Sequence, residues 1–160
     1  MRKSLHPAVV MAILSGLVLL PGHARSDDGF IRTTPDQVTF GNGPPGAPVQ
    51  AVLFDDPAKP GFYVVRVKFP PGAHSNPHFH SQDRHITVIK GVWWMGTGDT
   101  LDFNKAVPLK AGSYAFHPAG GVHWDGAADE ETIVQIAGMG PVETVEVGPK
   151  GAAGYWPRPK

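Results

Sequence analysis

The chain has 160 residues, and its 14 Lys and Arg residues are balanced by 14 Asp and Glu residues, so its formal net charge is zero. This balance excludes the basic surface expected of a nucleic-acid-binding protein and leaves no charged face that would seek a membrane. The sequence has no cysteine, which excludes disulfides, thiolate nucleophiles and thiolate metal ligands. Small molecules or other proteins are therefore the expected partners.

The first segment, residues 1–24, is predicted to be a cleaved signal peptide. Arg2 and Lys3 precede an apolar run over residues 8–20, which is shorter than the ~20 residues that usually span a bilayer. Small residues follow the run, and we expect cleavage after Ala24. The mature protein would then be periplasmic or secreted, with no stable membrane anchor. An uncleaved membrane anchor is the alternative.

The rest of the chain is predicted to form one all-β domain over residues 49–147, with an N-terminal arm over 25–48 and a tail over 148–160. The 20 Gly and 17 Pro residues divide the chain into short segments rich in β-branched and aromatic residues, and no later segment keeps a helical apolar period. The tail carries Tyr155 and Trp156, which are predicted to pack on the domain or on a second subunit of a homodimer.

The predicted strands are short and almost evenly spaced, which favours a sandwich or a closed barrel, because closure hides the strand edges. In chain order they are 38–40, 50–54, 62–69, 78–80, 85–90, 92–96, 106–110, 113–117, 123–125, 132–137 and 142–147. Adjacent Trp93 and Trp94 must then point to opposite faces of their strand.

Two segments place histidines at the spacing of a metal site. His78 and His80 are two residues apart, so on a strand they share one face and can point at one ion. His123 lies in the second segment, after a proline and two glycines at Gly112, Pro118 and Gly120.

These two segments resemble the two signature motifs of the cupin superfamily, G-x5-H-x-H-x3-4-E-x6-G and G-x5-P-x-G-x2-H-x3-N. The matching residues are Gly72, His78, His80 and Gly91 in the first motif and Gly112, Pro118, Gly120 and His123 in the second. The resemblance covers residues 72–127. It implies a small jelly-roll β-barrel holding one divalent metal through three histidines and, in most members, a glutamate.

The glutamate of the first motif is missing, and its place falls to Arg84 or to His85, depending on the spacer counted. Arginine cannot ligate a cation, because its charged guanidinium has only donors, whereas histidine can. Strand alternation counts against His85, because Arg84 would share the face of Ile86 and Val88 while His85 points to the other face. A bulge at 81–83 could reverse which of these faces points inward. The predicted metal ligands are His78, His80 and His123, either alone or with His85 as a fourth. In the competing interpretation, His85 packs outside the barrel and Arg84 pairs with a nearby acid such as Asp83 or Asp102.

Asp125 is the candidate catalytic residue, because it should share the face of His123 and could act as a general base or a substrate contact. The competing interpretation is a turn, since Asp125-Gly126 is a common turn pair. The asparagine of the second motif is replaced by Ala127. His74 and His117 are more simply explained as rim or structural residues.

Neutral imidazoles bind several transition metals. The general order of affinities of divalent metals for such ligands favours Cu or Zn over Fe, Mn or Ni. The sequence therefore predicts a metal-dependent cupin with one ion per chain that acts on a small molecule, and a dioxygenase-type oxidoreductase leads. The alternatives are a non-enzymatic protein that binds a metal or small ligand, or a zinc lyase, isomerase or cyclase. A closed shell of four histidines would favour the binding protein, and an open shell of three would favour catalysis.

Overall fold

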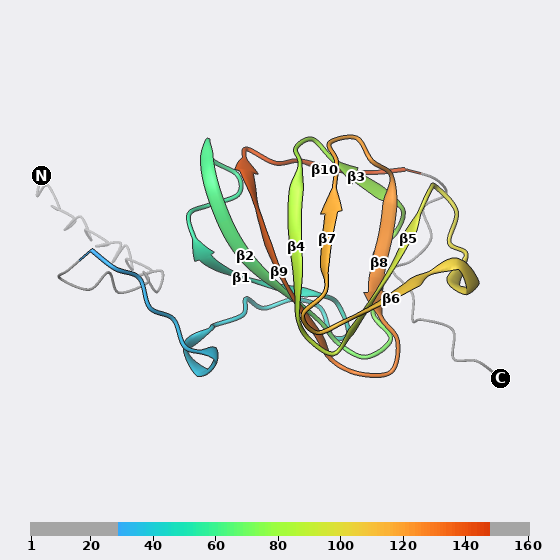
Figure 1. The fold of residues 1–160 in the computed structure, drawn as a ribbon, viewed down its shortest axis with the longest axis horizontal. Coiled ribbons are helices and arrows are strands. Elements are labelled where there is room, and N and C mark those ends of the chain that lie inside the picture. The colour runs from blue at the N-terminus through green and yellow to red at the C-terminus, as the bar shows by residue number, and fades with distance from the viewer. Residues whose placement is uncertain (1–28, 148–160) are drawn as a thin grey trace, which may run out of the picture. The chain divides into compact units, whose positions relative to one another are not determined.

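The computed structural model describes residues 29–147, and within them it shows an all-β fold with two antiparallel sheets, as predicted (Figure 1). The predicted signal peptide and C-terminal tail lie outside the described residues. The chain divides into two units after Arg32. In the described part of the first unit, the Arg32 guanidinium lies 5.0 Å from the centre of the Phe30 ring.

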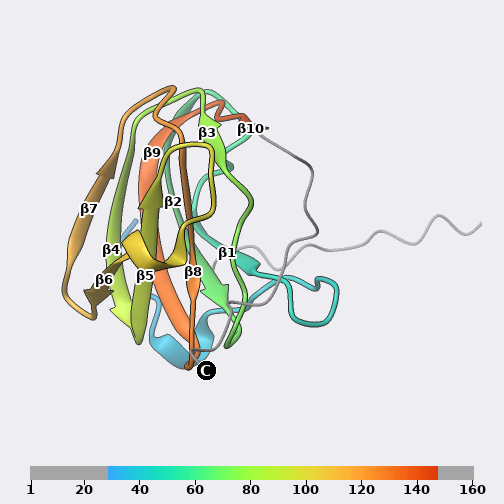
Figure 2. The ribbon, with the colours of Figure 1, turned by 90° about the vertical axis from the view of Figure 1, so that its right-hand side faces the viewer.

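Each sheet of the second unit has five strands (Figure 2). The first sheet, in spatial order, contains β1 (Val49–Phe54), β2 (Gly61–Phe69), β9 (Thr132–Gly140), β4 (Arg84–Lys90) and β7 (Tyr114–His117). The second contains β10 (Thr144–Glu146), β3 (His78–His80), β8 (His123–Ala127), β5 (Val92–Thr97) and β6 (Val107–Lys110). Two 3-10 turns, η1 (Pro35–Gln37) and η2 (Phe103–Lys105), lie outside the sheets. Among residues 29–147, no helix is long and apolar enough to cross a membrane.

The predicted strand at 38–40 does not form. Val38 instead caps the η1 turn, its N–H donating to the Pro35 carbonyl at 3.4 Å, and the first ladder residue is Val49. The intervening segment contains three prolines, which have no N–H to donate to a ladder. Conversely, β9 runs past the predicted end at 137, because all nine of its residues pair with β2.

The core lies between the inner faces of the two sheets. Alternation along the strands places one set of side chains inward, and the fully buried ones include Tyr63, Val65, Ile86, Val88 and Val134. Trp93 is 1% exposed on β5, while its neighbour Trp94 is only partly buried, as alternation requires. The same inner faces carry the histidines, so the apolar core forms the wall behind them.

Candidate metal centre

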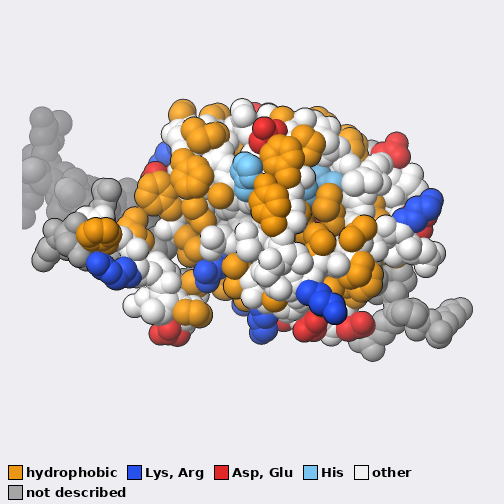
Figure 3. Space-filling model, viewed as in Figure 1, with side chains coloured by type: hydrophobic (Ala, Val, Ile, Leu, Met, Phe, Trp, Pro, Cys, Tyr) orange, Lys and Arg blue, Asp and Glu red, His pale blue; other side chains and the backbone are white. Residues whose placement is uncertain are grey.

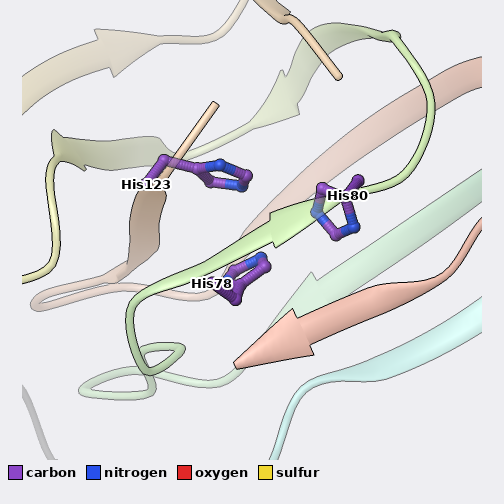
Figure 4. Close-up of side chains that lie close together, drawn as sticks. All are labelled: His78, His80 and His123. Atoms are coloured by element: carbon purple, nitrogen blue, oxygen red, sulfur yellow. The ribbon is translucent and has the colours of Figure 1, made fainter. Parts of the chain in front are cut away.

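Three of the predicted ligands meet in the structure (Figure 4). His78 and His80 lie on β3, and His123 lies on β8, where it is the register partner of His78. All three are buried, and one nitrogen of each lies within 4.8 Å of the others. The ring centres of His78 and His123 are 4.4 Å apart, and those of His80 and His123 are 5.1 Å apart. The period-2 spacing on the sequence therefore does bring these imidazoles together.

The hydrogen bonds of the three rings fix which nitrogen faces inward. The Nδ1 of His78 lies 2.7 Å from the Asn76 carbonyl oxygen, and that of His123 lies 2.9 Å from the Gly121 carbonyl oxygen. A carbonyl oxygen only accepts, so each Nδ1 carries the proton and each Nε2 keeps its lone pair. Metal-ligating histidines in proteins are commonly oriented in this way.

His80 shows the same polarity through different partners. Its Nε2 receives a hydrogen bond from the Arg84 guanidinium, which can only donate, and its Nδ1 therefore donates to the Thr144 hydroxyl oxygen at 3.0 Å. All three Nε2 atoms thus present lone pairs to the cluster. The Nε2 lone pair of His80, however, already accepts a hydrogen bond from the positively charged Arg84 guanidinium.

The donor set suits a divalent transition metal. The Nε2 atom of His123 is buried and has no hydrogen-bond partner among the described residues. A buried acceptor without a partner is rare in folded proteins, and a metal ion would give this lone pair a partner. Three neutral imidazoles with anchored Nδ1 atoms provide a site that copper, zinc, iron or nickel accepts.

His117 also belongs to this cluster, although the sequence indicated only a rim or structural role. It is buried on β7, its ring centre lies 3.8 Å from that of His123, and it stacks on Trp93 at 5.6 Å. Both of its ring nitrogens are buried without a hydrogen-bond partner in the described part of the chain. His117, His123 and Asp125 form a second group able to hold an ion.

The structure corrects the expectation for His85. Its side chain is exposed on the outer face of β4, where Nδ1 lies 2.8 Å from the Tyr114 hydroxyl oxygen. Figure 3 shows this outer face, where hydrophobic side chains gather over the sheet. β4 begins at Arg84 with regular pairing to β7, so no bulge reverses the alternation, and Arg84 takes the inner position instead.

Asp125 lies within β8 and not in a turn. Its carboxylate faces the cluster, with one oxygen 3.8 Å from the Nε2 of His123 and the other accepting a hydrogen bond of 3.4 Å from the Ser75 hydroxyl. The Ser75 hydroxyl oxygen also accepts the Asp125 backbone N–H at 2.9 Å. Asp125 is therefore buried, held in place and close to a candidate ligand.

Burial favours the neutral imidazoles of His80, His117 and His123. It lowers the pKa of His80 to about 2, with the Arg84 charge as the next cause, and it also lowers the pKa of His117 to about 2. Burial lowers the pKa of His123 as well, against the opposing effect of the Asp125 carboxylate. Neutral imidazole is the form that binds metals.

A cavity of about 340 Å³ opens beside the cluster. Apolar side chains provide most of its wall area and include Val67, Phe69, Ile86 and Val134. Its polar lining includes Arg84, Asp125, His78, His80 and His117. An apolar cavity of this size with a few convergent polar groups is typical of a small-molecule site.

The two facing sheets and the inward histidines define a cupin. The sequence matches the family described as the ChrR cupin-like domain over residues 28–143, and the chain belongs to this family. No curated protein matches the sequence.

Solved structures show the same fold. The polyketide cyclase RemF from Streptomyces resistomycificus has a TM-score of 0.59 and 21% identity, covering 74% of this chain and 87% of its own. KdgF from Halomonas sp. has a TM-score of 0.53 and 17% identity, covering 68% and 92%. An RmlC-like cupin from Shewanella frigidimarina has a TM-score of 0.53 and 17% identity, covering 67% and 87%. At these identities the likeness concerns the fold alone.

Proposed function

We propose that this protein is a metal-dependent cupin that acts on a small molecule, with dioxygenase-type oxidation as its leading reaction. The observation that carries the proposal is the convergence of three buried Nε2 lone pairs beside an apolar cavity. His78, His80 and His123 would hold one ion per chain, with Cu or Zn ahead of Fe, Mn or Ni. A redox-active ion would supply electron exchange between substrate and oxygen, and zinc would supply Lewis acidity.

The other residues of the cavity have their own tasks. Asp125 can accept a proton from a bound enol or phenol, since its carboxylate faces the cavity and Ser75 fixes its orientation. The apolar side chains in the walls lower the local polarity, which strengthens a polar contact made against them relative to the same contact in bulk water. The anchored Nδ1 atoms of the ligands keep the rings from turning when a small molecule enters or leaves.

A second candidate function is a non-catalytic metal-binding protein, and His117 favours it. If a ring nitrogen of His117, which has no hydrogen-bond partner within residues 29–147, joined the other three imidazoles, the ion would have four protein ligands. Closed shells of four protein ligands are typical of structural sites. A zinc lyase, isomerase or cyclase would use the three-histidine arrangement with a position left free for the substrate.

One experiment separates these candidates. The purified protein is analysed for its metals, and the spectrum of the copper- or cobalt-loaded form is recorded with and without azide. An open site predicts a spectral change and oxygen uptake with a phenolic, diketone or flavonol-like compound, slowed in Asp125→Asn. A spectrum that does not change on addition of azide, together with no oxygen uptake, would support a non-catalytic protein whose metal is bound by four protein ligands.

We also propose that the protein acts in the periplasm or outside the cell, on the basis of its N-terminal sequence. N-terminal sequencing of the protein from its native host tests this, and a mature chain that starts at Arg25 is expected. An intact Met1 in a membrane fraction would contradict it.

A further inference from the structure

We propose that Arg84 forms an anion subsite beside the metal centre and that the small molecule bound there carries a carboxylate or enolate. This inference rests on the proposed function, since it requires the ion to occupy the histidine cluster. It concerns the chemical class of the small molecule, which the metal site alone does not determine.

The first argument is the position of Arg84. It is the first residue of β4, it lines the cavity, and its guanidinium contacts His80, one of the three candidate ligands. Its buried Nε has no hydrogen-bond partner among the described residues, and none of the ion pairs found within 29–147 involves it. Arg84 is partly buried as a residue, and a guanidinium partly removed from water without an ion-pair partner at contact distance is costly unless a ligand completes it.

The second argument is the charge of the cavity. Arg84 supplies one permanent positive charge, and Asp125 is the buried carboxylate that faces it. Glu146 also lines the cavity but is exposed, so water screens its charge. The Tyr63 hydroxyl near Arg84 stays protonated, because burial raises its pKa. The charges of Arg84 and Asp125 cancel, so a bound divalent ion would give the cavity a net positive charge. Such a cavity favours an anionic ligand.

The third argument is competition for one lone pair. The Nε2 of His80 has a single lone pair, and in the structure the Arg84 guanidinium donates to it. The same atom cannot serve the ion and Arg84 together. Binding of the ion therefore frees a guanidinium N–H for the cavity, where its planar pair of donors matches the two oxygens of a carboxylate or the oxygen of an enolate.

The test measures binding to zinc-loaded protein, in which no redox reaction can interfere. Benzoate and benzamide serve as probes, because they have the same shape and differ in charge. The variant is Arg84→Gln. The matched control is Arg66→Gln, since Arg66 lies in the same sheet on β2, where its Nε donates to the Gln135 side-chain oxygen at 3.2 Å. Metal content and thermal stability are measured for every sample.

Arg84→Gln should weaken benzoate binding about tenfold or more while changing benzamide binding less than about twofold. Arg66→Gln should leave both affinities unchanged, and Arg84→Lys should restore part of the benzoate affinity, since a lysine keeps the charge without the planar fork. Equal losses for the two probes, or no loss for either, in protein that retains one zinc per chain would overturn the subsite and leave the metal centre intact. Wild-type protein that takes up no metal would overturn the metal centre and the subsite with it.

Discussion

Arg84 on β4 and His117 on β7 are register partners across the edge of the first sheet. Directly opposed residues in antiparallel strands send their side chains to the same face. A permanent cation and an imidazole that has no hydrogen-bond partner within residues 29–147 thus line the cavity side by side, opposite the candidate ligands of the second sheet. The first sheet therefore contributes a polar wall to a site whose ligands come from the second.

The three candidate ligands should be indispensable for metal retention. Replacing His78 or His123 with Ala removes one of three converging donors, so the metal content measured by elemental analysis should fall from about one per chain towards zero. The melting temperature should fall too, because a ligand present at 1,000 times its Kd adds about 4 kcal/mol to the free energy of unfolding. His85→Ala is the matched control, since that imidazole is exposed on the outer face. Full metal occupancy in the His78→Ala, His80→Ala double variant would rule out the assignment.

His117 should influence the ion more than its sequence context suggests. If it ligates, His117→Ala should weaken metal affinity by about 10- to 100-fold and shift the spectrum of the copper-loaded protein. His74→Ala provides the comparison, because His74 is also buried but its Nδ1 lies 3.0 Å from the Ser75 carbonyl oxygen. An unchanged spectrum and affinity in His117→Ala would show that only three histidines bind the ion.

The metal-free protein should lose stability in mild acid. Burial lowers the pKa of His80 and of His117 from 6.5, the ordinary value of an unfolded chain, to about 2 in the fold, because it disfavours the protonated imidazole. Between these values the unfolded state binds more protons, so the free energy of unfolding is largest above about pH 6.5 and falls as the pH is lowered. Melting temperatures between about pH 7.5 and pH 4.5 measure the effect above the usual carboxylate range.

The volume-conserving variant His117→Phe should show a shallower pH dependence than the wild type, since one of the two buried titrating groups is gone. A melting temperature that stays level across this interval in the metal-free wild type would contradict the expectation.

Gly96 should be intolerant of any side chain. A Cβ at this position would lie 2.2 Å from two ring carbons of Trp124, which is 1% exposed and adjacent to His123. Gly96→Ala should therefore displace the indole and lower the free energy of unfolding by about 1–3 kcal/mol, as measured by urea denaturation. Gly41→Ala is the control, because its Cβ would meet only the Gln50 carbonyl at 3.4 Å. Similar stabilities for the two variants would refute the packing argument.

The sequence predicted the parts of the site that depend on local spacing. His78 and His80 share a face through strand alternation alone. The second motif implied that His123 joins them, and the structure places it on β8 beside β3. The fold class also followed from local signals, since glycines and prolines mark most strand ends. The prediction of a strand at 38–40 was wrong, because a strand forms only where a neighbouring strand can pair with it. No local sequence pattern shows whether such a neighbour is available.

The wall formed by β4 and β7 could not be predicted in this way. The orientation of His85 depended on whether a bulge precedes Arg84, which is decided by pairing with β7 and β9. His117 was hidden by its neighbours: Tyr114 and Phe116 look like the buried face of their strand, yet they are 61% and 44% exposed. Only the pairing of β7 with β4 shows that Ala115 and His117 point inward.

The two candidate ligands of β3 lie on the most weakly held part of the second sheet. β3 has three residues, one register pair with β8 and three with the equally short β10. Because few hydrogen bonds hold these strands, the free energy of local opening should be small. Amide hydrogens of 78–80 and 144–146 should therefore exchange with solvent sooner than those of β2 and β9. An ion that links His78 and His80 to His123 would fasten this corner to β8, and loading should slow exchange there first. The region that opens most readily would then also be the route by which the ion enters and leaves.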